Sequence, residues 1–230
     1  MTSRETLTLR SFPRYVMLPA MALFIAAFAG LMISKTTPYY SFEPSISFLS
    51  TKSLETNQNI WFRVAFYTHI SSSIVVLVAG LAQWLPAVAK LGPRTHRAFG
   101  KAYVFGILAV AAPSGLVLAH FANGGLVAQV AFSLQAGVWW VATLLAYQNV
   151  RRQLWALHVV WMLRSYAVTL AALSLRGESY LFYYCLHTKP IETYLTVAWL
   201  SWVGNLLLVE VLIQVGLRRF FLRTHLAHLK

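Results

Sequence analysis

Four histidines lie within or beside long apolar segments of this 230-residue chain, and they are the side chains best suited to hold a cofactor. Ionisable residues inside a membrane are costly and by default indicate a functional site. A neutral imidazole is also a common ligand of iron in haem proteins. The four candidate cofactor-binding residues are His69, His96, His120 and His158.

His69 and His120 are predicted to lie near the same, outer surface of the membrane. His69 is close to the start of the apolar segment 63–88, on a helix face with small side chains that leave room for a flat macrocycle. His120 ends the segment 100–122. Helical side chains lean toward the N-terminus of their helix, so rings on these two antiparallel segments lean toward each other. The pair is a candidate for axial haem ligation; the alternative is that each ring hydrogen-bonds a neighbouring helix or interfacial water.

His96 and His158 form a second candidate pair at the inner surface. His96 lies in the basic segment 93–97, and His158 opens the apolar segment 154–175. The nearby arginines would neutralise the propionates of a second haem. The alternative is a solvated His96 and a His158 that hydrogen-bonds a neighbouring helix. If haem is bound, His69 and His158 are the residues predicted to coordinate its iron.

Arg164 and Glu210 are predicted to form an ion pair within the membrane. Arg164 lies near the middle of its segment, where an unpaired guanidinium costs several kcal/mol. Glu210 is the only acid inside any apolar segment. The Arg side chain leans inward and the Glu side chain outward, which brings their charges to similar depths. Such a pair either fixes helix packing or handles protons or anions.

The composition excludes a soluble protein. Hydrophobic residues make up 58% of the chain, charged residues only 11%, and the mean hydropathy is +0.61. Soluble domains carry about 25% charged residues. The net charge of +13 does not indicate nucleic-acid binding, because the cations lie in short segments between apolar runs. Motifs for nucleotide hydrolysis, zinc proteolysis, serine-triad chemistry and covalent haem attachment are missing, so the sequence assigns no enzymatic reaction.

The predicted fold is an all-α, polytopic membrane helix bundle in a single domain, 1–230. A membrane-spanning helix needs about 20 mostly apolar residues. Lys and Arg concentrate on one side of the spans, which predicts that both termini are cytoplasmic. The polar outer segment 35–62 is long enough to form either an interfacial element or a lid over His69. The six predicted transmembrane helices are 15–34, 63–88, 100–122, 126–149, 154–175 and 193–217.

Three groups of residues resemble the DUF2306 family, a group of bacterial and fungal membrane proteins of unknown function. The resemblance covers residues 60–177, and His120 is not part of the pattern. The family is loosely similar to two-haem cytochrome b561-type bundles, in which paired histidines hold b haems. The expected location is the bacterial inner (plasma) membrane, as an integral, multi-pass protein. The matching residues are His69, Gly80, Gln83, His96, Arg97, Gly100, Lys101, Tyr103, His158, Trp161, Met162, Arg164, Ser165, Tyr166, Ala167 and Arg176.

The leading hypothesis is an integral membrane protein that binds one or two b-type haems and transfers electrons to or from a quinone or a redox protein. Axial ligands and burial would set the potential of such a centre. The first alternative is a cofactor-free scaffold or assembly subunit, in which the histidines serve helix packing. The second is a small-molecule or ion transporter centred on Arg164 and Glu210.

Overall fold

A computed structural model describes residues 18–85 and 91–217 of the chain, and these residues form helices without any strand. Two of the helical segments, η3 and η4, have π-helical hydrogen bonding. Residues 1–17, 86–90 and 218–230, which hold many of the cations that orient the termini, lie outside the described residues. The elements are α2 (Leu18–Thr36), η2 (Thr37–Ser41), α3 (Ser47–Ser50), α4 (Leu54–Gln58), α5 (Ile60–Trp84), α7 (Pro93–Phe105), η3 (Gly106–Ala111), α8 (Ala112–His120), α9 (Leu126–Arg151), α10 (Trp155–Thr169), α11 (Ala171–Tyr180), η4 (Leu181–Cys185) and α12 (Pro190–Gln214).

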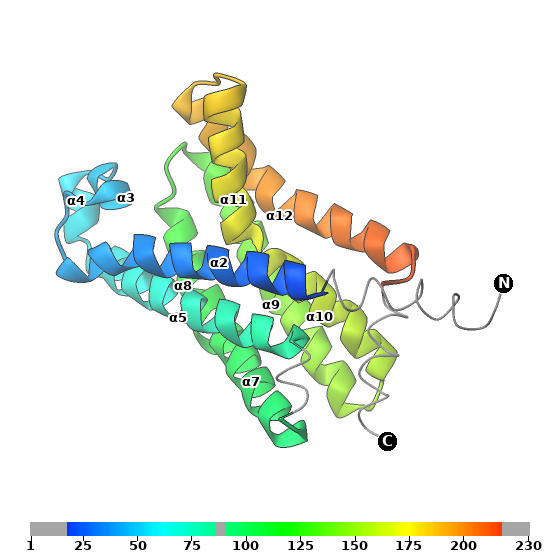
Figure 1. The fold of residues 1–230 in the computed structure, drawn as a ribbon. Helices are drawn as coiled ribbons and strands as arrows, with labels where there is room; N and C mark the ends of the chain where they lie inside the picture. Colours follow the sequence, from blue (N-terminus) through cyan, green and yellow to red (C-terminus); the bar gives the residue numbers. More distant parts are fainter. Residues whose placement is uncertain (1–17, 86–90, 218–230) are drawn as a thin grey trace.

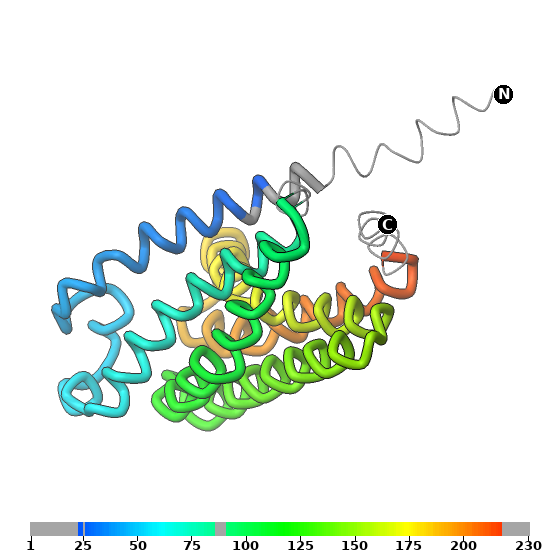
Figure 2. The backbone as a smooth tube through the Cα atoms, turned by 90° about the horizontal axis from the view of Figure 1, so that it is seen from below, coloured from blue at the N-terminus to red at the C-terminus, as the bar shows by residue number. Residues whose placement is uncertain are grey.

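Long helices that are consecutive in the sequence mostly pack against each other. α2 lies along α5, and α5 packs on the continuous run α7–η3–α8 (Figures 1 and 2). α8 and α10 both pack against α9, while α11 and α12 form a hairpin whose tip projects at the top of Figure 1. Short connections between antiparallel helices favour this order.

Four of the described helices are long and apolar enough to cross a membrane, and a fifth span is formed if the bent pair α10–α11 counts as one. The predicted six spans and the orientation of the termini are therefore not confirmed. α2 is a helix where the first span is predicted, but it is not among the helices that meet this criterion. The four helices are Ile60–Trp84, Pro93–His120, Leu126–Arg151 and Pro190–Gln214.

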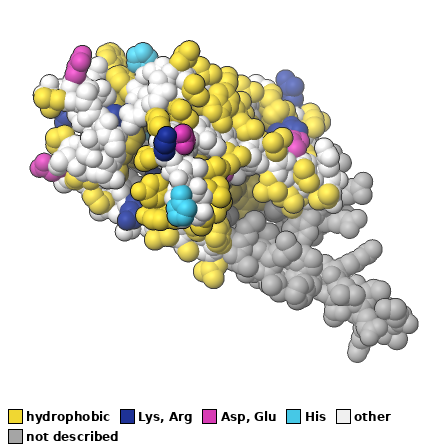
Figure 3. Space-filling view, turned by 90° about the horizontal axis from the view of Figure 1, so that it is seen from above, with side chains coloured by type: hydrophobic (Ala, Val, Ile, Leu, Met, Phe, Trp, Pro, Cys, Tyr) yellow, Lys and Arg dark blue, Asp and Glu magenta, His cyan; other side chains and the backbone are white. Residues whose placement is uncertain are grey.

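The surface of the bundle is strongly apolar, as contact with lipid requires. Large hydrophobic side chains such as Val75, Leu116, Val141 and Leu207 are more than half or nearly half exposed. Hydrophobic side chains also cover much of the face seen in Figure 3. Soluble monomers rarely expose apolar surface on this scale. The helices therefore present lipid-facing sides, and the chain is a multi-pass membrane protein.

The helix that begins at Trp155 bends by 41° between α10 and α11. At the bend, Asn205 of α12 donates to the carbonyl oxygen of Ala167 at 3.0 Å and accepts from Ser174 at 2.9 Å. Kinks without proline commonly have a side chain inserted into the helical ladder. After the bend the chain stays helical to Cys185, so the helix continues past residue 175, where the predicted span 154–175 ends.

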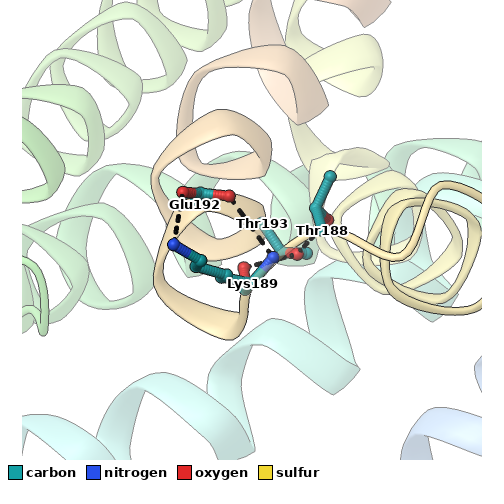
Figure 4. Close-up of polar contacts among 4 residues, drawn as sticks. All are labelled: Thr188, Lys189, Glu192 and Thr193. Carbon is teal, nitrogen blue, oxygen red and sulfur yellow. Dashed lines mark hydrogen bonds and ion pairs between the residues drawn. The ribbon is translucent and has the colours of Figure 1, made fainter.

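α12 begins at a compact polar cap after a short connection (Figure 4). Pro190 occupies the first turn, and the Glu192 carboxylate accepts from the backbone N–H of Lys189 at 3.4 Å. Thr193 donates to the Lys189 carbonyl at 3.0 Å and bonds Thr188 at 2.6 Å. The Glu192 bond pairs a backbone N–H at the helix start, where such donors have no partner within the helix. The Lys189–Glu192 ion pair is exposed and adds little stability.

Gly80 allows three elements to approach closely in the core. A Cβ atom on Gly80 would lie 2.4 Å from Cε2 of Tyr166 and 2.8 Å from Cε2 of Tyr103. Both rings are buried, and Tyr103 is fully so. Nearby, Gln83 donates to the carbonyl of His96 at 3.0 Å and so ties α5 to the start of α7. Several residues that carry the family resemblance therefore form one packing cluster.

We expect Gly80→Ala to destabilise the bundle by about 1–3 kcal/mol, because the new methyl group overpacks two buried rings. Gly137→Ala is the matched control, since a Cβ there has no neighbour within 4 Å and alanine favours helix. Thermal unfolding of the purified proteins in detergent measures both effects. Equal midpoints for the two variants would contradict the proposed packing role of Gly80.

Candidate functional site

A cavity of about 410 Å³ lies at the end of the bundle where the sequence predicts the outer surface. α5, α8, α9 and α11 form its walls, while α2 and the segment 39–52 close it from the other side. Most lining side chains are apolar or aromatic, and none of those in residues 18–85 and 91–217 is a carboxylate. The polar and charged side chains that line it are Thr36, Tyr39, Lys52, His69, Ser73, Gln135, Trp139, Thr169, Arg176 and Tyr194.

His69 lines this cavity with its ring orientation set by the backbone of the neighbouring helix. Its Nδ1 lies 2.9 Å from the carbonyl oxygen of Ala111. A carbonyl only accepts, so Nδ1 carries the proton and Nε2 remains as an acceptor or metal-ligating nitrogen. Gly115 allows this approach, because a Cβ there would lie 3.0 Å from Cε1 of His69.

The carbonyl that orients His69 belongs to Ala111, the last residue of the π-helical segment η3. Pro113, in the first turn of α8, has no N–H to continue the regular ladder. Wider turns of this kind are frequent at functional sites. Here Trp140 of α9 donates to the Leu108 carbonyl at 3.0 Å, and Ser114 donates to the Val110 carbonyl at 2.7 Å. Side chains from α5, α8 and α9 thus hold the irregular segment that orients His69.

The segment between α2 and α5 covers the cavity as a lid, which comprises η2, α3 and α4. The Lys52 ammonium donates to the carbonyl of Phe121 and, at 2.7 Å, to Oδ1 of Asn123. Asn123 in turn donates to Thr51 at 3.0 Å. Below these bonds Leu49 packs in a buried aromatic cluster with Phe62 and Phe66. The lid is therefore fastened to the α8–α9 turn by polar contacts and to α5 by apolar ones.

Lys52 and Arg176 are the lysine and arginine side chains of the cavity lining. Lys52 is half-buried, and burial lowers the pKa of its ammonium to about 8. Arg176 donates from Nη1 to the Ala172 carbonyl of its own helix at 2.8 Å. Within residues 18–85 and 91–217 the ion pairs are Arg164–Glu210 and Lys189–Glu192, so neither cavity cation has a carboxylate partner there.

The inner end of the cavity rests on a buried hydroxyl network that the sequence did not predict. Thr169 and Trp139 line the cavity and are joined by a 3.0 Å hydrogen bond. Tyr103 bonds the hydroxyls of Thr169 and Ser165, each at 2.8 Å, and Ser165 bonds Thr143 at 2.7 Å. Buried polar groups are kept when they are fully paired. The network joins α7, α9 and α10 at the centre of the bundle.

The structure does not bring His120 into the cavity with His69. His120 ends α8 as an exposed side chain, and its ring packs against Phe121 at a centroid distance of 5.2 Å. The residues on either side of it, Ala119 and Phe121, line the cavity instead. His120 therefore faces away from the cavity that its two neighbours line.

At the predicted inner surface, His158 and His96 occupy the first turns of α10 and α7. His158 Nδ1 lies 2.9 Å from the Ala146 carbonyl of α9, which repeats the arrangement of His69 on α5. The backbone carbonyl of His96 accepts from Gln83. In the described part of the chain no three His, Cys, Asp or Glu side chains gather into a metal-binding group.

Arg164 and Glu210 form the ion pair that the sequence predicts. Arg164 Nε lies 2.5 Å from Oε1 of Glu210, and Nη2 lies 3.1 Å from Oε2, so the contact is bidentate. The guanidinium also lies over the Trp161 ring at 4.4 Å. The two side chains are 26% and 38% exposed, which places the pair at the side of the α10–α12 packing and outside the cavity lining.

We expect the Arg164–Glu210 contact to be energetically coupled. Glu210→Gln or Arg164→Met leaves one charge unpaired in an apolar environment, whereas the double variant Arg164→Met/Glu210→Met removes both. Thermal unfolding should therefore give a coupling free energy of about 0.5–3 kcal/mol, toward the lower value because the pair is partly exposed. The exposed Lys189–Glu192 pair serves as a control with almost no coupling. Additive single effects at Arg164 and Glu210 would contradict the prediction.

The fold and the cavity define a multi-pass, all-helical membrane protein with a ligand-sized cavity at one end of the bundle. The chain belongs to the DUF2306 family: the family model, described as "Predicted membrane protein", matches residues 66–213. The resemblance seen in the sequence is thus confirmed, and the match extends past Glu210. No curated protein matches the chain, and no solved structure does. The match includes His69 and Arg176 but not the lid.

Proposed function

We propose that this protein binds a small, largely apolar molecule in the cavity beneath the lid. The observation that carries this proposal is the cavity itself, with about 410 Å³ of space between aromatic and aliphatic side chains. Small-molecule sites are typically apolar cavities of about 300–1,000 Å³ that hold a few placed polar groups. His69 and Gln135 supply such groups. A ligand that partitions into the membrane would reach the site from the lipid phase.

A saturable binding signal from a fluorescent amphiphile tests the proposal. Dansylaminoundecanoic acid methyl ester brightens in apolar surroundings, and empty nanodiscs correct for partition into lipid. Ser73 lines the cavity, and its hydroxyl has no hydrogen-bond partner, so Ser73→Phe fills space without breaking a bond. We expect it to weaken binding about tenfold or more, because the filled volume excludes the ligand.

Val78→Phe is the matched control, since Val78 is on the same helix and 42% exposed. It should bind the ester like the unaltered protein. If the unaltered protein gives no saturable signal, or if both variants bind equally well, the cavity is not the binding site.

A second candidate is haem b in the same cavity, with electron transfer to or from a quinone or a redox protein. It is favoured by the bond from His69 Nδ1 to Ala111, which leaves Nε2 for iron and fixes the ring as metal-ligating histidines usually require. Met32 also lines the cavity and carries a thioether of the kind that ligates haem iron. Lys52 and Arg176 would pair with the propionates. When bound, the haem would supply reversible one-electron chemistry.

Absorption spectra of protein purified from haem-replete cells test the haem candidate. We expect a Soret band that sharpens on reduction and is lost in His69→Ala, because that variant removes the proposed axial ligand. His120→Ala is the control and should keep the spectrum, since His120 is exposed. Two haems per chain, with one lost in His158→Ala, would add the inner pair His96–His158. A colourless protein would exclude this candidate and leave the binding proposal untouched.

Two other hypotheses from the sequence remain proposals with less support. A scaffold or assembly subunit does not require a lidded internal cavity. A transporter centred on Arg164 and Glu210 would need that pair on a passage through the bundle, whereas neither residue lines the cavity.

A further inference from the structure

We propose that Lys52 and Arg176 bind the acidic headgroup of the cavity's ligand, so that the occupant is an amphipathic anion: an apolar body that carries a carboxylate or a phosphate. This inference rests on the proposed binding function and names its ligand class. The two cations belong to different elements, the lid and α11, and both line one cavity that, among the residues the structure describes, no acidic side chain lines.

Lys52 has a charge that its surroundings do not neutralise. Both of its hydrogen-bond acceptors, the Phe121 carbonyl and the Asn123 amide, are uncharged. Its Nζ lies 4.8 Å from the ring centroid of Phe48 and 6.0 Å from that of Phe62. An ammonium group has three N–H donors, so one remains for a ligand. Burying a cation is costly unless an anion pairs with it, and an acidic ligand would supply that anion.

Arg176 is the second cation of the proposed headgroup site. One of its five N–H groups bonds the Ala172 carbonyl of its own helix, which holds the guanidinium in place. Glu178, two residues further along the chain, forms no ion pair with it and does not line the cavity. A guanidinium with free N–H pairs matches the planar oxygens of a carboxylate or phosphate. Arg176 is exposed at the rim, so the headgroup would lie at the rim and the apolar body inside.

The two cations also differ in where they lie relative to the family match. Arg176 falls inside residues 66–213, and Lys52 precedes them. Lys52 fastens the lid to Phe121 and Asn123 at the α8–α9 turn. An anion between Lys52 and Arg176 would join the lid to α11 as well. The lid therefore contributes headgroup selectivity and, when the site is occupied, is held closed by the ligand.

The decisive comparison is between dansylaminoundecanoic acid and its methyl ester, in nanodiscs of zwitterionic lipid. We expect the unaltered protein to bind the acid about tenfold or more tightly than the ester, because charge-assisted hydrogen bonds form only with the acid. Lys52→Gln and Arg176→Gln should each bring the ratio of acid affinity to ester affinity, compared within the same variant, close to one. Lys189→Gln, which removes an exposed cation outside the cavity, should keep the preference.

The outcomes separate the two proposals. If neither probe binds, the proposed function fails. If the acid and the ester bind equally and the glutamine variants do not change either affinity, the binding function stands. The proposal that Lys52 and Arg176 bind an acidic headgroup is then wrong. Retained ester binding shows that each variant is folded. Competition by dodecanoate against dodecyl phosphate then distinguishes a carboxylate from a phosphate headgroup.

A pH series isolates the contribution of Lys52. Because its pKa is about 8, raising the pH from about 7 to about 9 removes its proton, and the affinity for an anion should fall. Dodecylsulfonate is the competitor of choice, since its charge is constant over this range. The other titratable groups that line the cavity are Tyr39, His69, Arg176 and Tyr194. Lys52→Arg stays protonated, so it should abolish the fall; an unchanged pH profile would overturn the role of Lys52.

Discussion

The requirement that every backbone polar group be paired inside the bilayer governs this structure. Where the helices are irregular, side chains from neighbouring helices satisfy the carbonyl groups. His69 bonds Ala111 at the end of η3, and Asn205 bonds Ala167 at the bend between α10 and α11. Each bond joins two helical segments that are distant in the sequence. The ring of His69, which lines the cavity, is therefore oriented by its bond to a carbonyl of an irregular helical segment.

The residues that carry the family resemblance have two structural roles. Some build the core: Gly80 admits the rings of Tyr103 and Tyr166, and the Tyr103 hydroxyl joins α7 to α10 through Ser165. Others reach a surface or a cavity, as His69 does. A shared pattern of residues in a membrane protein therefore reflects close packing as much as chemistry, because small residues and paired hydroxyls hold helices together in lipid.

The cavity is lined both by residues inside the family match and by residues that precede it. Its inner walls come from the segment that matches the family, while the lid and Lys52 come from the preceding residues. A site built in this way can keep its apolar interior and its histidine while the lid varies the selectivity at the rim. Ligand sites are commonly positioned by a rigid scaffold and varied by the segments that connect its elements.

Composition and periodicity determined the helical, membrane-embedded class of this protein, because apolar runs of this length have few other stable structures. The Arg164–Glu210 pair followed from the sequence for a similar reason, since a lone acid and a lone base within spans have no other partners. The outward turn of His120, the bend at residue 170, the Thr169 hydroxyl network and the lid over the cavity were decided by tertiary structure. These features depend on which faces of the helices meet. A π-helical turn or a kink rotates one part of a helix relative to the next, and the spacing of residue types in the sequence does not give the size of that rotation.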